Sequence, residues 1–236
     1  MTSSFIPLWK NEWNLALRYG FVSIYIVLSI IYIVIVRHVP TSIRSEVLQL
    51  LIFTDPVVLG FYFVGGSVLF EKSEKVLSSL FVSPIPSYSY LLAKALNFSL
   101  LSVMVSFVIT IGGIGFSFQP LILFLAVGLT SLVFTLWGLI VVSRKENVPE
   151  YLLYSLVYLI PFFIPLLGFF PFTDAWWLYL FPTQATLLLL KGSFQGISAF
   201  DLVYSIVYLL VFICISALWA KRWFDKYVIA QIGGGE

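Results

Sequence analysis

One polar segment separates long apolar runs of this chain, and it reads Glu71-Lys-Ser-Glu-Lys-Val-Leu-Ser-Ser-Leu-Phe-Val-Ser-Pro-Ile-Pro-Ser-Tyr-Ser-Tyr-Leu-Leu-Ala-Lys94. A helical repeat of about 100° per residue gathers its apolar side chains within an arc of roughly 140°. These side chains are Val76, Leu77, Leu80 and Phe81, and the charged and hydroxyl groups fall on the other side. Pro84 prevents a regular helix from continuing, and Ser87 can cap a new helix that runs through Lys94. The segment therefore predicts a short amphipathic helix between two membrane spans, ended by a rigid proline corner.

The composition of the whole chain indicates an integral membrane protein. Of its 236 residues, 61% are hydrophobic and 10% are charged, and the mean hydropathy is +1.04. Soluble domains average about 25% charged residues, so we expect no separate soluble domain. The formal net charge of +2 is too small to indicate a nucleic-acid partner.

The apolar runs predict an all-α membrane protein that forms a single transmembrane domain over residues 1–236. Runs of about 20 apolar residues can cross a bilayer as helices. The six expected spans are residues 20–36, 47–70, 95–118, 121–142, 151–172 and 202–220. Residues 5–18 read as an amphipathic helix on the membrane surface, or as an extension of the first span. Residues 175–191 are short, apolar and broken by Pro182, so we expect a re-entrant outer segment before the sixth span.

The basic residues predict the orientation, because Lys and Arg concentrate on the cytoplasmic side of membrane proteins. If both termini are cytoplasmic, ten basic residues are inside: Lys10, Arg18, Lys72, Lys75, Lys94, Arg144, Lys145, Lys221, Arg222 and Lys226. Only Arg37, Arg44 and Lys191 are outside. This count places the segment 71–94 in the cytoplasm.

Asp55 is the ionisable residue deep within an expected span, and Pro56 follows it. Ionisable groups at membrane depth are costly, and they usually face the bundle interior or a wet cavity. A polar point on a transport pathway, meeting a cationic substrate, is one interpretation. An interhelical hydrogen bond is the commoner one.

Motifs of catalysis and cofactor binding do not occur in the sequence. It has no Gly-x-x-x-x-Gly-Lys-Ser/Thr, so the chain carries no phosphate-binding loop of its own. It also lacks His-Glu-x-x-His, Cys-x-x-Cys and Gly-x-Ser-x-Gly. His38, the single histidine, has no Cys or acidic cluster beside it. We expect neither enzymatic activity nor a bound metal or cofactor.

The segment 71–94 resembles the cytoplasmic loop of ABC-2-type transporter permeases. The residues that match that pattern are Glu71, Lys72, Leu77, Leu80, Ser83, Pro84 and Lys94. Lys75-Val76 stands in place of Gly-Thr, Ser78 in place of an acidic residue and Ala93 in place of Gly. The Leu-Phe-Pro-Thr sequence at 180–183 is similar to the outer segment of the same family. Within this family, the chain looks most like drug-export permeases of the fluoroquinolone-export type, and it is also similar to the haem-exporter permease of cytochrome c maturation.

The resemblance implies a permease subunit of an ATP-binding-cassette exporter in the cell membrane. Its cargo would be hydrophobic or amphipathic, drug-like or lipid, moved by alternating access. It would work with a separate ATPase subunit, which carries ATP and Mg²⁺, and with a second permease copy or paralogue. The residues implied to couple to the ATPase are Glu71, Lys72, Glu74, Lys75, Val76, Leu77, Leu80, Phe81 and Pro84. The four charged ones would form a polar rim, and the apolar ones would bury against the ATPase or against the chain's own helix ends. A non-ABC channel or scaffold subunit is the alternative.

Overall fold

The computed structural model describes residues 5–54, 58–77, 86–170 and 175–229, and the regular structure in these residues is entirely helical. The expectations for Asp55, Leu80, Phe81 and Pro84 lie outside the described residues. The elements are α1 Phe5–Arg18, α2 Phe21–His38, α3 Arg44–Ile52, α4 Val58–Ser73, α6 Ser87–Ile114, α7 Pro120–Val142, α8 Val148–Phe163, α9 Leu166–Phe169, the 3₁₀ helix η2 Trp176–Leu180, α10 Pro182–Gln195, α11 Ala199–Phe224 and the π-helical turn η3 Asp225–Ile229.

Within the part of the chain that the structure describes, four helical stretches are long and apolar enough to cross a membrane: α2, α6, α7 and residues 199–229. They contain most of the first, third, fourth and sixth expected spans. Helix α6, which contains the third expected span, begins at Ser87, because Pro86 adopts an extended conformation at its N-cap. Its first two turns therefore belong to the polar segment quoted above.

The fifth expected span is an interrupted helix, and the described part of the second expected span lies on either side of residues 55–57. Residues 47–70 divide between α3 and α4, and residues 151–172 divide between α8 and α9. Proline lacks the amide donor and clashes with the preceding turn. Pro161 lies inside α8, and Pro165 is the N-cap of α9. The six-span topology, like the re-entrant course of residues 175–191 through η2 and α10, stays a prediction.

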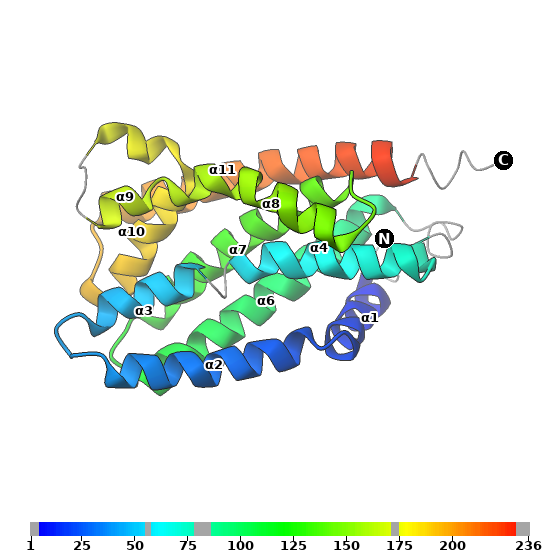
Figure 1. Ribbon diagram of the computed structural model, residues 1–236. Coiled ribbons are helices and arrows are strands. Elements are labelled where there is room, and N and C mark those ends of the chain that lie inside the picture. Colours follow the sequence, from blue (N-terminus) through cyan, green and yellow to red (C-terminus); the bar gives the residue numbers. More distant parts are fainter. Residues whose placement is uncertain (1–4, 55–57, 78–85, 171–174, 230–236) are drawn as a thin grey trace.

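Helix α7 lies at the centre of the bundle and packs against α4, α6, α10 and α11. Figure 1 shows the long helices running along one axis. At one end of this axis lie α1, the last turns of α4 and the last turns of α11; we call this the α1 end. At the opposite end, the α10 end, lie α3, α9 and α10.

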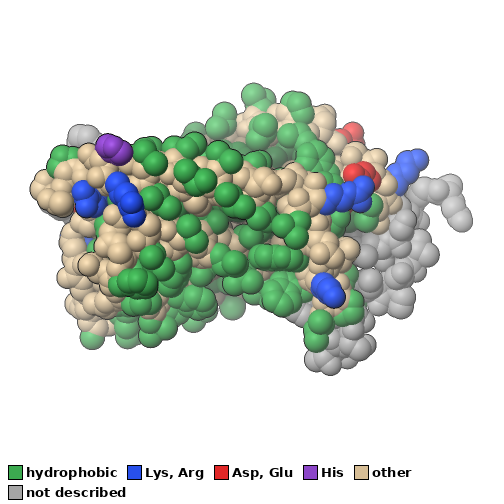
Figure 2. Space-filling model, turned by 90° about the horizontal axis from the view of Figure 1, so that it is seen from below, with side chains coloured by type: hydrophobic (Ala, Val, Ile, Leu, Met, Phe, Trp, Pro, Cys, Tyr) green, Lys and Arg blue, Asp and Glu red, His purple; other side chains and the backbone are tan. Residues whose placement is uncertain are grey.

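The surface agrees with a membrane crossing along this axis. On the face seen in Figure 2, Lys, Arg and His side chains gather toward the two ends, and hydrophobic side chains cover the band between them. Lipid tails can contact such a band without desolvating charges.

Candidate functional site

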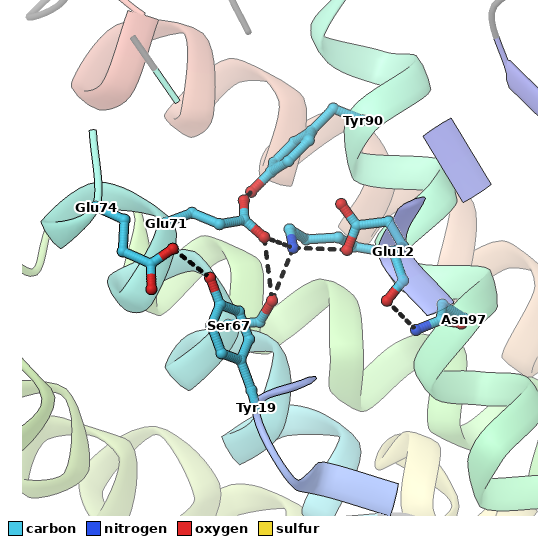
Figure 3. Close-up of polar contacts among 8 residues, drawn as sticks. Glu12, Tyr19, Ser67, Glu71, Glu74, Tyr90 and Asn97 are labelled. Carbon is cyan, nitrogen blue, oxygen red and sulfur yellow. Dashed lines mark hydrogen bonds and ion pairs between the residues drawn. The ribbon is translucent and has the colours of Figure 1, made fainter. Parts of the chain in front are cut away.

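A buried group of ionised side chains joins α1, α4 and α6 at the α1 end (Figure 3). The ammonium nitrogen Nζ of Lys94 lies 2.7 Å from Oε2 of Glu12 and 2.5 Å from Oε1 of Glu71. Lys94 is fully buried, and Glu12 and Glu71 are only 4% and 1% exposed. A charge held this far from water must be paired and hydrogen-bonded. We call Glu12, Ser67, Glu71, Tyr90, Lys94 and Asn97 the ionic cluster.

Hydrogen bonds complete the ionic cluster. Lys94 Nζ also donates to Ser67 Oγ at 2.8 Å, so each of its three N–H groups has an acceptor. Ser67 Oγ donates to Glu71 Oε1 at 3.2 Å, and the Tyr90 hydroxyl donates to Glu71 Oε2 at 2.6 Å. Asn97 Nδ2 donates to the backbone oxygen of Glu12 at 3.4 Å. The cluster therefore fixes the contacts among three helices.

Helical spacing brings these side chains together. On α1, Leu8, Glu12 and Ala16 are four residues apart, and all three are buried. Ser67 and Glu71 are four apart on α4, and the cluster residues of α6 are 90, 94 and 97. Residues three and four apart share one helix face. Each helix thus turns one partly polar face toward the same point.

Two carboxylates share one ammonium in this cluster, and the pKa of Glu12 reflects this. Burial raises the pKa of Glu12 from 4.5 to about 7, since the loss of water outweighs the attraction of Lys94, and the carboxylate of Glu71 adds to the rise. Near neutral pH, Glu12 therefore changes between a protonated and an ionised form. Protonation leaves a single carboxylate beside the ammonium.

Glu71 is buried, whereas the sequence predicted that it would lie on a water-facing rim. Helix α4 continues to Ser73, past the expected end of the span at residue 70, and it carries Glu71 into the bundle interior. The amphipathic helix expected from residue 71 onward is therefore wrong in its first turn. The physical reason is the pairing with Lys94, which a local pattern does not reveal.

The other described residues of the expected coupling segment lie nearer the surface. Lys72 Nζ donates to the backbone oxygens of Val142 at 3.3 Å and Lys145 at 2.9 Å, and burial lowers its pKa to about 8. Glu74 accepts a hydrogen bond from the Tyr19 hydroxyl at 3.1 Å.

Beyond Glu74 the chain turns. Lys75 has a φ of 57° and is exposed, and Val76 is half-buried. Leu77 is 2% exposed and belongs to the chain's own hydrophobic core. Of the two partners considered for the apolar residues, Leu77 therefore packs against the chain's own helices.

Sequence reasoning missed the roles of Glu12, Tyr90, Lys94 and Asn97 as one group. Two signals were present. Glu12 interrupts the apolar side of α1, and Lys94 precedes a long apolar run in a helix that continues to Ile114. Each implied a partner of opposite charge, although nothing in the sequence named it. Among the described residues, no three His, Cys, Asp or Glu side chains come together as a metal site.

Comparisons with known proteins agree over nearly the whole chain. Residues 4–232 match the sequence model of the fluoroquinolones export permease protein family. Two relatives, from Mycobacterium tuberculosis strains CDC 1551 / Oshkosh and H37Rv, are both called fluoroquinolones export permease protein. Each is 28% identical over 238 residues, which cover 97% of this chain and 98% of the relative. The similarity therefore includes both ends of the helical bundle.

Proposed function

Because the chain belongs to the fluoroquinolones export permease protein family, we propose that it is the transmembrane subunit of an ATP-binding-cassette exporter for drug-like amphipathic molecules, fluoroquinolones among them. A separate ATPase subunit binds ATP and Mg²⁺, and a second permease copy or paralogue completes the transporter. The α1 end faces the cytoplasm, and so do both termini. The family favours a drug as cargo over haem.

The ionic cluster is the observation that carries this proposal. It joins α4 and α6, the two helices on either side of residues 74–86, and it also holds α1. A force applied to the segment between α4 and α6 therefore moves three helix ends together. Transporters that alternate between two states depend on this kind of rigid-body motion.

The contact with the ATPase then involves fewer residues than the sequence suggested. Lys72, Glu74 and Lys75 form the polar rim, and Glu71 is an internal anchor. Val76 together with Leu80, Phe81 and Pro84 completes the contact. Closure of the ATPase subunits around ATP pushes on this surface, and the spans rock as rigid bodies.

Co-purification is the first test of this function. The tagged chain, extracted from its native membrane, is expected to retain an ATPase subunit with a phosphate-binding loop. Vesicles that contain both are expected to export a fluorescent fluoroquinolone only when ATP and Mg²⁺ are supplied on the ATPase side. Export at an equal rate without ATP, or purification without any ATPase, would overturn the proposal.

A variant tests the coupling segment itself. Leu80→Asp places a charge on the proposed apolar contact, so we expect normal membrane insertion and loss of ATP-driven export. Ile43→Asp is the matched control, because Ile43 is 45% exposed in the connection between α2 and α3 at the α10 end. Substrate-stimulated ATP hydrolysis that is unchanged by Leu80→Asp would count against the docking role.

A further inference from the structure

A cavity of about 380 Å³ opens at the α10 end, far from the ionic cluster, between α3, α9 and α10. Its volume lies in the range of small-molecule sites, about 300–1,000 Å³. Its polar lining consists of Glu46, Gln49, Gln184, Lys191 and Gln195. Phe169, Leu187 and Leu188 supply an apolar wall. The cavity thus combines charge, amides and an aromatic ring.

Two opposite charges line the cavity without neutralising each other. Glu46 lies in the first turn of α3, and Lys191 lies near the C-terminal end of α10. Neither forms an ion pair with any residue that the structure describes. A ligand that carries both an amine and a carboxylate would give each charge a partner.

Gln49 is the second, independent sign of a ligand. Its side chain lines the cavity but the residue is only 2% exposed, and its Nε2 has no hydrogen-bond partner among the described residues. A buried donor without an acceptor destabilises a fold. A carbonyl or carboxylate oxygen of a bound molecule would accept a hydrogen bond from this amide.

We propose that this cavity binds zwitterionic aromatic molecules that carry one amine and one carboxylate. Glu46 receives the amine, Lys191 receives the carboxylate, Gln49 donates to a ligand oxygen, and the ring of the ligand lies against Phe169. This inference rests on the proposed function and names the charge class of its substrate.

Three fluorescent probes with the same aromatic core and different charges test the assignment. Norfloxacin carries both groups, its ethyl ester keeps only the amine charge, and its N-acetyl derivative keeps only the carboxylate. Fluorescence anisotropy measures Kd for each probe with the full-length chain in lipid nanodiscs. Wild type is expected to bind the zwitterion about tenfold more tightly than either singly charged probe, a difference of about 1.4 kcal/mol.

Two charge-neutralising variants are expected to give crossed results. Glu46→Gln weakens the zwitterion and the ester about tenfold and leaves the N-acetyl probe unchanged. Lys191→Gln weakens the zwitterion and the N-acetyl probe and leaves the ester unchanged. The matched controls, Glu146→Gln and Lys221→Gln, alter exposed residues outside the cavity and bind as wild type does.

Gln49→Leu separates binding from folding. We expect weaker binding of all three probes, together with an unfolding temperature of the ligand-free protein that is equal to or above that of wild type. A purely structural amide would instead lower the unfolding temperature and leave Kd unchanged, and that result would overturn the assignment of Gln49.

The inference and the proposed function fail in different ways. If Glu46→Gln and Lys191→Gln bind all three probes as wild type does, the site is wrong, even where ATP-driven export by wild type stands. If the crossed pattern appears but wild-type vesicles export without ATP, the site stands and the proposed function is wrong.

Discussion

At the scale of a single residue, Lys94 of α6 connects this helix to α1 and α4 at the α1 end. Its ammonium meets acceptors from α1 and α4, and it is fully buried. A buried pair of this kind often contributes little net stability against well-packed apolar residues, yet the loss of one partner leaves an uncompensated charge. The side chain therefore specifies how three helices meet more than it adds to the free energy of unfolding.

Lys94→Met is expected to destabilise the protein by roughly 3–5 kcal/mol, because two buried carboxylates lose their counter-charge. Thermal unfolding in detergent measures the effect. Lys10→Met, on the exposed side of α1, is the matched control and is expected to change stability by about 0.5 kcal/mol or less. Adding Glu12→Gln and Glu71→Gln to Lys94→Met should recover much of the loss. A Lys94→Met protein as stable as the control would contradict the ionic cluster.

Glu12 predicts a pH dependence whose sign follows from its raised pKa. The folded state binds a proton more tightly than the unfolded state, with a pKa of about 7 against 4.5. The contribution of protonated Glu12 to the free energy of unfolding is therefore fully present below about pH 4.5 and is lost as pH rises through 7. The pKa of Lys72, which is lowered from 10.5 to about 8, makes the stability depend on pH mainly above pH 8, outside the range in which Glu12 titrates.

The measurement is the unfolding temperature of wild type and Glu12→Gln from pH 5 to pH 7.5. The wild-type value is expected to fall by several degrees more than that of Glu12→Gln. Parallel curves would show that the pKa of Glu12 is not raised.

At the scale of elements, α4 depends on close approaches that only glycine permits. A side chain at Gly65 would overlap the ring of Tyr151, whose hydroxyl donates to the backbone oxygen of Phe61 at 2.6 Å. A side chain at Gly138 of α7 would meet the same carbonyl. Helix α4 therefore packs closely against both α7 and α8 at the same level of the bundle.

Gly65→Ala is expected to cost about 1–3 kcal/mol, because overpacking moves Tyr151 and breaks its hydrogen bond. Gly66→Ala is the neighbouring control, since its new methyl group would lie 3.6 Å from the Phe21 ring, an ordinary contact. Unfolding temperatures of the two variants compare the sites directly. Equal values would show that α8 does not pack where the structure places it.

Elements with continuous apolar patterns were predictable, and contacts between distant residues were not. Residues 121–142 form one unbroken run, and α7 spans Pro120–Val142. The second expected span carries Asp55-Pro56, and its described residues belong to α3 Arg44–Ile52, a π-helical turn at residues 53–54 and α4 Val58–Ser73. Glu12 and Lys94 are 82 residues apart, so no local periodicity could pair them. Glu71 was misplaced for the same reason.

At the scale of the whole molecule, the two ends differ in chemistry. The α1 end holds a closed ionic cluster, and the α10 end holds an open polar cavity. The helices between them present hydrophobic side chains on the face seen in Figure 2.

Accessibility labelling tests the proposed orientation, in which the α1 end faces the cytoplasm. After Cys214→Ala removes the single cysteine, Ser42→Cys and Glu146→Cys place thiols at exposed positions of opposite ends. An impermeant maleimide is expected to label Ser42→Cys in intact cells and Glu146→Cys only after permeabilisation. The reverse pattern would invert the proposed topology.

The distance in sequence between Glu12 and Lys94 also has a meaning for biosynthesis. The first helix leaves the ribosome many residues before the lysine that completes its anchoring. Until then the carboxylate of Glu12 lacks the cation that pairs with it in the folded structure. We therefore expect α1 to reach its final position only after α6 has been made, because a nascent chain shorter than 94 residues lacks the lysine that pairs with Glu12.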